Sequence, residues 1–340
     1  MNTKNKYIFI GIALLVAGLA MMLFRSAPNV GSDSKIPPLT TLNVRLPIPA
    51  ADAGFAPFYL GIDKGFFEKA GIKVNLLPGT PELNPVKMAG LGTDQIGLVG
   101  GPELLFSARE KKLPVVGVAL LGMNADFAGL VTLKSSGLTK LDQLQGKRVG
   151  FFTGHISTDI LHMLFRKNNI KVTEVDTGFD YGPLINGSID AEWAFRTTAG
   201  INLPAKGVEI NFISAADNGI STDGYTVIAN EDYEKKNPDV MARFVGALID
   251  ATKYAVEHPE EAVEATMRRD PNFKKEVGEK QVPIYSKAIT NLPRLGDFSS
   301  AEISRTVEQM KQGGLLPPEF DPSGAFDPRF VNTYYSSKAQ

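Results

Sequence analysis

The chain has 340 residues, of which 43% are hydrophobic and 21% charged, a balance typical of a globular protein with room for two cores. Basic and acidic residues number 36 and 37, and no basic run indicates nucleic acid. The sequence has no cysteine, which excludes thiolate chemistry, cysteine-bound zinc and disulfides. Its three histidines are too scattered to indicate a metal site.

The first predicted element is an uncharged apolar run over residues 7–24, preceded by Lys4 and Lys6. Its length lies between the core of a signal peptide and a minimal membrane span. Residues 18–20 offer a small-x-small cleavage site. We therefore expect residues 1–25 to be a signal peptide or membrane anchor. The polar, turn-rich residues 26–39 are expected to form a linker.

The next elements are a strand, a loop, a helix and a second strand. Residues 42–46 alternate between apolar and polar, as a half-buried strand does. Residues 59–69 fit one amphipathic helix that ends at Gly71, and a strand follows up to Leu77. The loop at residues 53–59 joins strand to helix, which is where open α/β folds place ligand sites.

Strand and helix signals alternate along the rest of the chain. We predict strands at residues 94–99, 115–121, 127–133, 148–152, 171–175, 191–195 and 225–230, and helices at 102–111, 141–146, 157–168 and 238–258. This βαβ order indicates largely parallel sheets. The chain crosses out along 127–133 and returns along 225–230, which predicts two lobes. Lobe I comprises 40–130 with 226–336, and lobe II comprises 131–225.

Four segments of the chain carry a family resemblance. They are Lys64-Gly-Phe-Phe-Glu68 with the glycine and strand after it, Gly187-Ser-Ile-Asp-Ala191, Asn237-Pro-Asp-Val-Met-Ala-Arg-Phe244 and Glu257-His-Pro-Glu-Glu-Ala-Val263. Over residues 42–316 the chain resembles the substrate-binding proteins of ABC importers for nitrate, sulfonates, taurine and thiamine-precursor pyrimidines. The resemblance implies an α/β, two-lobe periplasmic-binding-protein fold (type II-like) with a ligand cleft between the lobes. It also implies an extracytoplasmic location, a permease with its ATPase as partners, and membrane attachment through the N-terminal segment if that segment is uncleaved.

Candidate ligand contacts in lobe I lie in two strand-to-helix loops. Phe55, Phe58 and Tyr59 can stack on a flat ligand, or they can simply pack the lobe. Gly100 and Gly101 precede a helix whose free backbone N–H groups can bind an anion or a carbonyl oxygen, although a plain tight turn has the same pattern.

Candidate contacts in lobe II lie in the corresponding loop and on the strand at 191–195. His155, Ser157 and Thr158 can donate to a ligand, and the last two can instead cap a helix. Glu192 and Trp193 point to opposite faces of a strand, so both cannot face one cleft, and Trp193 can equally pack the core. Asp223 lies at the second crossing, where it can touch the ligand or shape the hinge.

The predicted function is a solute-binding protein that closes two lobes on a flat heteroaromatic ligand such as a vitamin or pyrimidine precursor. Binding of sulfonate or nitrate and a membrane-anchored sensor ectodomain are the alternatives. Pyrimidine-precursor binders often carry an acidic residue shortly after the strand at 191–195, where this chain has residues 197–200 without one. The same fold family includes a pyrimidine-forming enzyme that uses cysteine and histidine with a pyridoxal cofactor. Since this chain has no cysteine, we expect no enzyme and no cofactor.

Overall fold

The computed structural model describes residues 39–339, apart from residues 81, 124, 153–155 and 179. The predicted signal or anchor segment and nearly all of the predicted linker lie outside the described residues. Within the part of the chain that is described, no helix is both long enough and apolar enough to cross a membrane.

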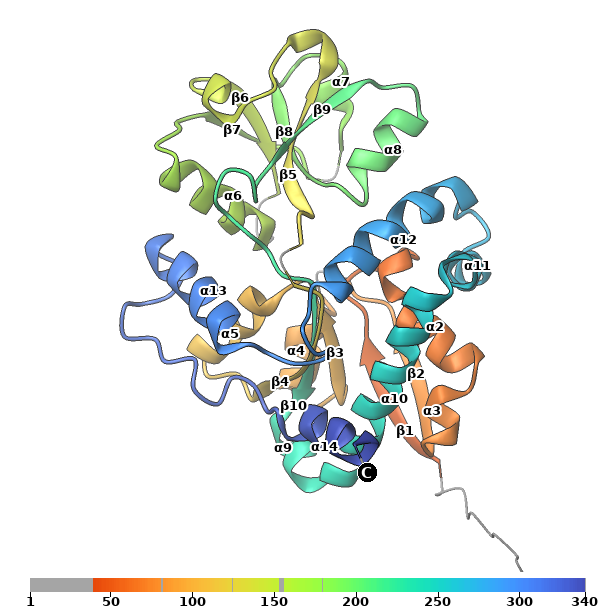
Figure 1. The fold of residues 1–340 in the computed structure, drawn as a ribbon. Helices are drawn as coiled ribbons and strands as arrows, with labels where there is room; N and C mark the ends of the chain where they lie inside the picture. The colour runs from red at the N-terminus through yellow and green to blue at the C-terminus, as the bar shows by residue number, and fades with distance from the viewer. Residues whose placement is uncertain (1–38, 81, 124, 153–155, 179, 340) are drawn as a thin grey trace, which may run out of the picture. The chain divides into compact units, whose positions relative to one another are not determined.

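Two five-stranded sheets organise the described chain (Figure 1). The first has the order β2-β1-β3-β10-β4, and the second has the order β7-β6-β8-β5-β9. The first sheet consists of β1 (Thr40–Arg45), β2 (Ile72–Leu77), β3 (Ile96–Val99), β4 (Val115–Leu121) and β10 (Tyr225–Asn230). The second sheet consists of β5 (Ala128–Leu133), β6 (Arg148–Phe151), β7 (Thr173–Asp176), β8 (Ala191–Phe195) and β9 (Ile210–Ser214).

Both sheets are largely parallel, as predicted, and each contains one reversed strand. In the first sheet β1 runs parallel to β2 and β3, whereas β10 is antiparallel to β3 and β4. In the second sheet β6 runs parallel to β7 and β8, whereas β5 is antiparallel to β8 and β9. The strands β5 and β10 each follow a crossing between the sheets instead of a covering helix, so they can enter their sheets in the reverse direction.

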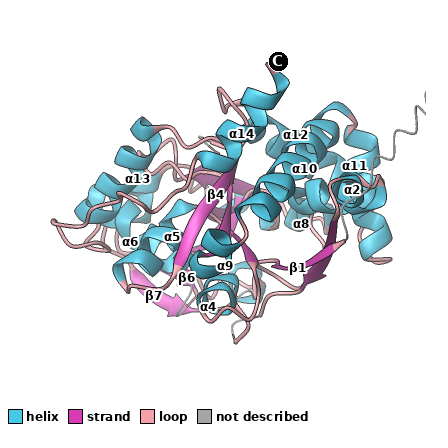
Figure 2. Ribbon diagram, turned by 90° about the horizontal axis from the view of Figure 1, so that it is seen from below, coloured by secondary structure: helices cyan, strands magenta, loops and turns pink. Residues whose placement is uncertain are grey.

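Helices cover both sheets. Those around the first sheet are η1 (Ala53–Phe55), α2 (Ala56–Asp63), α3 (Phe66–Lys69), α4 (Pro85–Gly90), α5 (Pro102–Glu110), α9 (Glu231–Lys236), α10 (Pro238–Glu257), α11 (Pro259–Arg269), α12 (Lys275–Thr290), α13 (Ser300–Gln312) and α14 (Arg329–Lys338). Those around the second are η2 (Lys134–Ser136), η3 (Leu141–Leu144), α6 (Ile156–Lys167), α7 (Gly182–Ile185) and α8 (Ala199–Ala205). Figure 2 shows β1 and β4 among these helices, and α10 packs against both α2 and α14.

The helix predicted over residues 59–69 is two helices, α2 and α3. Gly65 separates them with a φ of 72°, a left-handed conformation that breaks the helix and that glycine adopts without strain. The turn brings Phe67 back against the core, where its ring stacks on Phe244 of α10 with the ring centres 5.7 Å apart. Gly71 follows α3 with a φ of 71°, as the sequence predicted for a helix end.

The two segments that cross between the sheets lie side by side. Ala125 and Thr222 form a β-bridge, in which the Ala125 N–H donates to the Thr222 carbonyl at 2.9 Å. The Gly224 N–H donates to the Gly122 carbonyl at 2.9 Å. A methyl group on Gly224 would lie 2.8 Å from the Gly122 Cα, so the close approach of the two segments requires glycine. We call the first sheet with its covering helices lobe I and the second sheet with its covering helices lobe II. The residue limits given above for the two lobes stay a prediction.

Candidate functional site

The best-defined polar site starts in the loop that follows β1. Asp52 precedes η1, and its side chain accepts a hydrogen bond from the Gly54 N–H at 2.7 Å. The turn of η1 buries this carboxyl group, which is only 3% exposed. A buried carboxyl group needs partners close by, because removing it from water without them is costly.

Gln281 of α12 supplies such a partner and also reaches lobe II. Its Oε1 accepts from the Ala53 N–H at 3.1 Å, and its Nε2 donates to Asp52 Oδ2 at 3.1 Å. The same Nε2 donates to the Thr197 carbonyl at 2.7 Å, and Thr197 lies just after β8. One buried amide therefore joins the first strand-to-helix loop of lobe I to the end of a strand of lobe II.

Aromatic rings line this contact. The Phe55 and Tyr225 ring centres are 5.4 Å apart, and the Tyr225 and Tyr285 rings stack at 5.9 Å. Phe127, next to the first crossing, lies 5.2 Å from Tyr285, and Phe55 meets Tyr59 edge-on at 6.3 Å. The rings come from lobe I and from the two crossing segments.

Gly54 makes the ring packing possible. A methyl group at Gly54 would lie 2.6 Å from the Tyr225 ring and 2.7 Å from the Tyr285 ring. We call the following residues the Asp52 cluster: Asp52, Gly54, Phe55, Tyr59, Phe127, Thr197, Tyr225, Gln281 and Tyr285.

The electrostatics of the Asp52 cluster favour uncharged groups. Burial raises the pKa of Asp52, and hydrogen bonds from Tyr285, Gly54 and Gln281 only partly oppose that shift. Burial, with the Asp52 charge nearby, raises the pKa of Tyr59 to about 12 and those of Tyr225 and Tyr285 well above their usual range. The phenols therefore stay protonated and can donate hydrogen bonds. Aromatic faces and protonated hydroxyl groups are the kinds of group that bind a planar ring with N–H and carbonyl groups.

The aromatic residues predicted in the first loop take different places. Phe55 and Tyr59 belong to the Asp52 cluster. Phe58 is fully buried in the core of lobe I, where it stacks on Phe67 at 6.5 Å.

Gly100 and Gly101 lie between β3 and α5, as predicted. Gly100 is exposed, and a methyl group there would meet nothing within 4 Å. Gly101 is buried, and a methyl group there would lie 2.3 Å from Oε2 of Glu103. Asp223, at the second crossing, accepts from Arg305 Nη2 at 2.9 Å through both carboxylate oxygens. Its carboxylate is thus bound to α13.

The described contacts predicted in lobe II lie in α6 and β8. His155 lies outside the described residues. Helix α6 begins at Ile156, so Ser157 belongs to its first turn. The Thr158 hydroxyl is buried and donates to the Phe152 carbonyl.

Glu192 and Trp193 lie on opposite faces of β8, as alternation along a strand requires. Glu192 Oε1 accepts from the Thr177 hydroxyl at 2.9 Å, and its Oε2 has no partner among the described residues. Burial is the main reason that the pKa of Glu192 is raised to about 7. Trp193 is fully buried in an apolar cluster with residues of α6, and its Nε1 also lacks a partner in the described structure.

Sequence reasoning missed Asp52, Phe127, Thr197, Gln281 and Tyr285. Asp52 had a usable signal, since an aspartate that follows a strand and precedes a helix is a common cap. Gln281 and Tyr285 had none, because only the tertiary fold brings α12 to the loop after β1.

Comparison with known proteins identifies the family of the chain. A family model described as NMT1/THI5 like matches residues 52–262, more than half of the chain. The chain belongs to the NMT1/THI5-like family. The resemblance that the sequence predicted is confirmed by this match.

Relatives of this NMT1/THI5-like protein include both enzymes and binding proteins. A 4-amino-5-hydroxymethyl-2-methylpyrimidine phosphate synthase from Schizosaccharomyces pombe is 26% identical over 289 residues, which cover 78% of this chain and 80% of that protein. A formylaminopyrimidine-binding protein from Halalkalibacterium halodurans is 27% identical over 293 residues, which cover 82% of this chain and 86% of that protein.

The fold prediction is confirmed by solved structures. The putative periplasmic sulfonate-binding protein SsuA of a sulfonate ABC transporter from Methylobacillus flagellatus KT matches with a TM-score of 0.68 at 19% identity. The match covers 89% of this chain and 96% of that one. At this identity the likeness shows the periplasmic-binding-protein fold alone.

The prediction that the chain is not an enzyme needs correction. Several relatives that this chain matches over about four fifths of their length are named as pyrimidine phosphate synthases, which are enzymes. The members of the Asp52 cluster include no lysine that could form an imine with a pyridoxal aldehyde, so the cluster does not fit that cofactor. Among the described residues no group of three or more histidine, aspartate or glutamate side chains is placed to hold a metal ion.

Proposed function

We propose that this NMT1/THI5-like protein is an extracytoplasmic solute-binding protein of an ABC importer that closes its lobes on a flat, N–H-bearing heteroaromatic ligand of the aminopyrimidine type. The observation that carries the proposal is the Gln281 amide, which touches Asp52 in lobe I and Thr197 in lobe II between aromatic rings. A ligand that takes over or adds to such contacts binds the closed form better, and this difference in affinity shifts the lobes toward closure.

The chemistry of the Asp52 cluster supports a heteroaromatic ligand. Tyrosine and phenylalanine faces give area and orientation to a planar ring. The Asp52 carboxyl group accepts hydrogen bonds from ring amines, and protonated tyrosine hydroxyls can donate to ring nitrogens. The relative from Halalkalibacterium halodurans is named as a formylaminopyrimidine-binding protein, which agrees with this ligand class.

Sulfonate or nitrate is the alternative ligand class. Two arginines of lobe II, Arg148 and Arg196, carry the charge that an anion would need, and both are paired with carboxylates. Arg148 Nη2 lies 3.0 Å from Asp190 Oδ1, and Arg196 Nη2 lies 2.5 Å from Asp126 Oδ2. An anion would have to displace these carboxylates, so the described contacts favour the heteroaromatic ligand.

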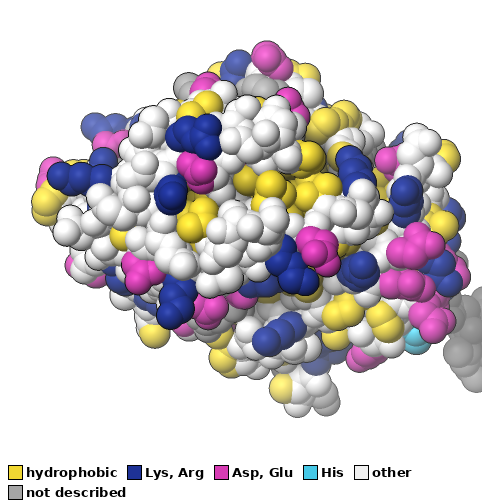
Figure 3. All heavy atoms as spheres, turned by 90° about the horizontal axis from the view of Figure 1, so that it is seen from above, with side chains coloured by type: hydrophobic (Ala, Val, Ile, Leu, Met, Phe, Trp, Pro, Cys, Tyr) yellow, Lys and Arg dark blue, Asp and Glu magenta, His cyan; other side chains and the backbone are white. Residues whose placement is uncertain are grey.

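The proposed partners are a small-molecule ligand, a permease with its ATPase, and the membrane through residues 1–25 if they stay attached. On the face drawn in Figure 3, Lys and Arg side chains are interspersed with Asp and Glu and form no continuous basic area. This distribution gives no support to a nucleic-acid partner on that face.

Thermal-shift and calorimetric titrations would test the proposal with formylaminopyrimidine, 4-amino-5-hydroxymethyl-2-methylpyrimidine and its phosphate, taurine and nitrate. A pyrimidine at 100 times its Kd should stabilise the protein by about 2.7 kcal/mol. D52N should weaken that effect, whereas D190N, the same change in an ion pair within lobe II, should not. Stabilisation by taurine or nitrate alone would overturn the proposal.

Synthase chemistry is the second candidate function, because the Schizosaccharomyces pombe relative carries a synthase name. Mass spectrometry of the purified protein after incubation with candidate precursors distinguishes the two functions. A newly formed pyrimidine phosphate would support synthesis, and recovery of an unchanged bound pyrimidine would support transport.

A further inference from the structure

Helix α13 connects the lobes on a side of the molecule that the Asp52 cluster does not use. Val307 and Met310 of α13 are buried in one apolar cluster with Phe106 of α5 and Leu164 of α6. Helix α5 covers the first sheet and α6 covers the second. The apolar face of α13 therefore packs against both lobes at once.

The C-terminal end of α13 is tied to lobe II. The Arg166 guanidinium of α6 donates to the Gly313 carbonyl. A methyl group on Gly313 would lie 2.2 Å from Met163 Cγ, which shows how closely the end of α13 sits on α6.

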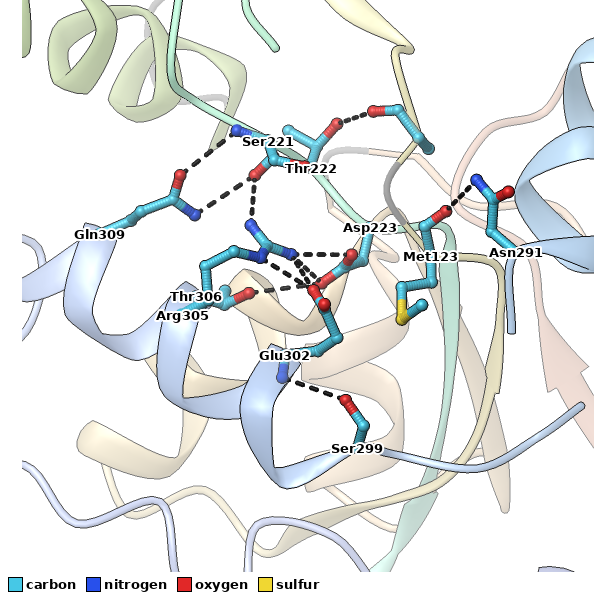
Figure 4. Close-up of polar contacts among 11 residues, drawn as sticks. Met123, Ser221, Thr222, Asp223, Asn291, Ser299, Glu302, Arg305, Thr306 and Gln309 are labelled. Atoms are coloured by element: carbon cyan, nitrogen blue, oxygen red, sulfur yellow. Dashed lines mark hydrogen bonds and ion pairs between the residues drawn. The ribbon is translucent and has the colours of Figure 1, made fainter. Parts of the chain in front are cut away.

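The middle of α13 is tied to the second crossing (Figure 4). Arg305 Nη2 donates to both carboxylate oxygens of Asp223 at 2.9 Å, and its Nη1 donates to the Ser221 carbonyl at 3.1 Å. The Thr306 hydroxyl donates to Asp223 Oδ2 at 3.3 Å, and Gln309 Oε1 accepts from the Ser221 N–H at 3.2 Å. A planar guanidinium held by a buried carboxylate and a carbonyl fixes both position and orientation.

The two interlobe connections differ in kind. On the α12 side the described contacts are the Gln281 amide, which spans from Asp52 to Thr197, the ring contact of Tyr285 with Phe127, and the packing of α12 on α8. On the α13 side, buried apolar packing is combined with the charged contacts of Arg305. Hydrogen bonds of one amide are exchanged for water more readily than a packed core is opened.

Glu103 of α5 lies beside the contact between Arg305 and Asp223. It is buried, and its Oε2 lies against Gly101, close to the Asp223 backbone. The charged groups that face Glu103 are Asp223 from the crossing and Arg305 from α13. Glu302 of α13 also pairs with Arg305, and its Oε2 lies 2.7 Å from Arg305 Nη2. The carboxylates of Asp223 and Glu302 thus hold one guanidinium, and the charges of Asp223 and Arg305 both act on Glu103.

We propose that α13 is a strap about which the lobes pivot, so that the cleft opens on the Gln281 side, and that ionisation of Glu103 loosens this strap. A second negative charge beside Asp223 favours separation of α5 from the crossing, because one guanidinium cannot balance every carboxylate around it. Burial first and Asp223 second raise the pKa of Glu103 to about 7, which makes a change near neutral pH accessible.

The inference does not depend on the ligand, so its test can fail independently of the proposed function. Because the sequence has no cysteine, two introduced cysteines take spin labels specifically. One pair, K280C with K206C, spans the α12 side between α12 and the end of α8. The other pair, K111C with K171C, spans the α13 side between the end of α5 and the segment after α6. All four side chains are exposed.

Distance distributions from electron–electron double resonance on the ligand-free full chain give the readout. We expect two populations for the α12-side pair and a single narrow one for the α13-side pair. An α13-side distribution as broad as that of the other pair would overturn the proposal without any further variant.

Two substitutions test the parts of the strap. R305Q should broaden the α13-side distribution, whereas R148Q, which breaks an ion pair inside lobe II, should leave it unchanged. Between pH 6 and pH 8 the α13-side distribution should broaden in the parent protein and stay narrow in E103Q. An unchanged distribution in folded R305Q would overturn the strap, and an equal pH effect in E103Q would overturn the role of Glu103.

Discussion

Individual residues of the Asp52 cluster are held by steric fit. Gly54 lies against the rings of Tyr225 and Tyr285, and an added methyl group would come within 2.8 Å of both. Such overlap forces side chains off their preferred rotamers. The requirement for glycine at position 54 therefore comes from packing, unlike that at Gly65, where the backbone conformation decides.

We predict that G54A destabilises the protein by about 1–3 kcal/mol, because the methyl group overfills the space between the two tyrosines. G100A is the matched control, since nothing lies within 4 Å of the added methyl group. That control should change the free energy of unfolding by less than about 0.5 kcal/mol. Urea unfolding measures both. Equal costs for the two variants would contradict the packing account.

Glu192 should make stability depend on pH. The folded protein holds its proton up to a pKa of about 7, whereas the unfolded chain releases it near 4.5. The folded state therefore binds more protons between these values, and its stability falls as the pH rises through that window. E192Q removes the titrating group. The gain in free energy of unfolding of E192Q over the parent protein should therefore be larger at pH 8 than at pH 5, by up to about 3 kcal/mol. Urea unfolding at the two pH values checks this, and an equal effect at both would contradict it.

At the scale of elements, α12 matters because it crosses between parts of the chain that are remote in sequence. Its Gln281 reaches Asp52, Ala53 and Thr197. Replacing Gln281 with leucine leaves the Asp52 carboxyl group and the Ala53 N–H buried without this partner. We expect Q281L to cost about 1–3 kcal/mol of stability.

A double-mutant cycle of Q281L with D52N measures whether the two residues act together. Their direct contact predicts a coupling energy of about 0.5–3 kcal/mol in chemical denaturation. Q281L with D190N serves as the control, because Asp190 pairs with Arg148 in lobe II. Strict additivity of Q281L with D52N would show that Gln281 stabilises α12 alone.

Elements with strong local signals were predictable from the sequence. The strands at 115–121, 191–195 and 225–230 agree with β4, β8 and β10, and the helix at 238–258 agrees with α10. The pairing direction of β5 and β10 was not predictable, because it depends on how the crossings enter the sheets. The candidate site was predicted only in the loop after β1, where Phe55 and Tyr59 lie. Its other half comes from α12 and from the crossing residues, whose local sequence carries no sign of the contact.

For the whole molecule, several buried acids shift the pH dependence of stability in one direction. Burial raises the pKa values of Glu103 and Glu192 to about 7 each and also raises the pKa of Glu234. Paired acids such as Asp63 and Asp190 have lowered pKa values instead, so their contribution is lost only as the pH falls through those lowered values. Stability should therefore be greatest near the ordinary pKa of a carboxyl group.

We predict that the melting temperature passes through a maximum between about pH 4 and 5 and falls up to about pH 7. Differential scanning fluorimetry from pH 3 to pH 9 measures the profile. The double variant E103Q/E192Q should flatten the descending side. A melting temperature that rises steadily from pH 5 to pH 7 in the parent protein would contradict the prediction.

The position of β10 also has a consequence for the order in which the chain can fold. β10 lies between β3 and β4, so the first sheet stays in two pieces until residues 225–230 have been made. The second sheet uses only strands from residues 128–214 and is complete earlier. During synthesis on a ribosome the second sheet can therefore form first, and the edges of β3 and β4 stay unpaired until β10 has been made. Because the two crossings meet at Ala125 and Thr222, the inserted segment that carries the second sheet begins and ends at adjacent points.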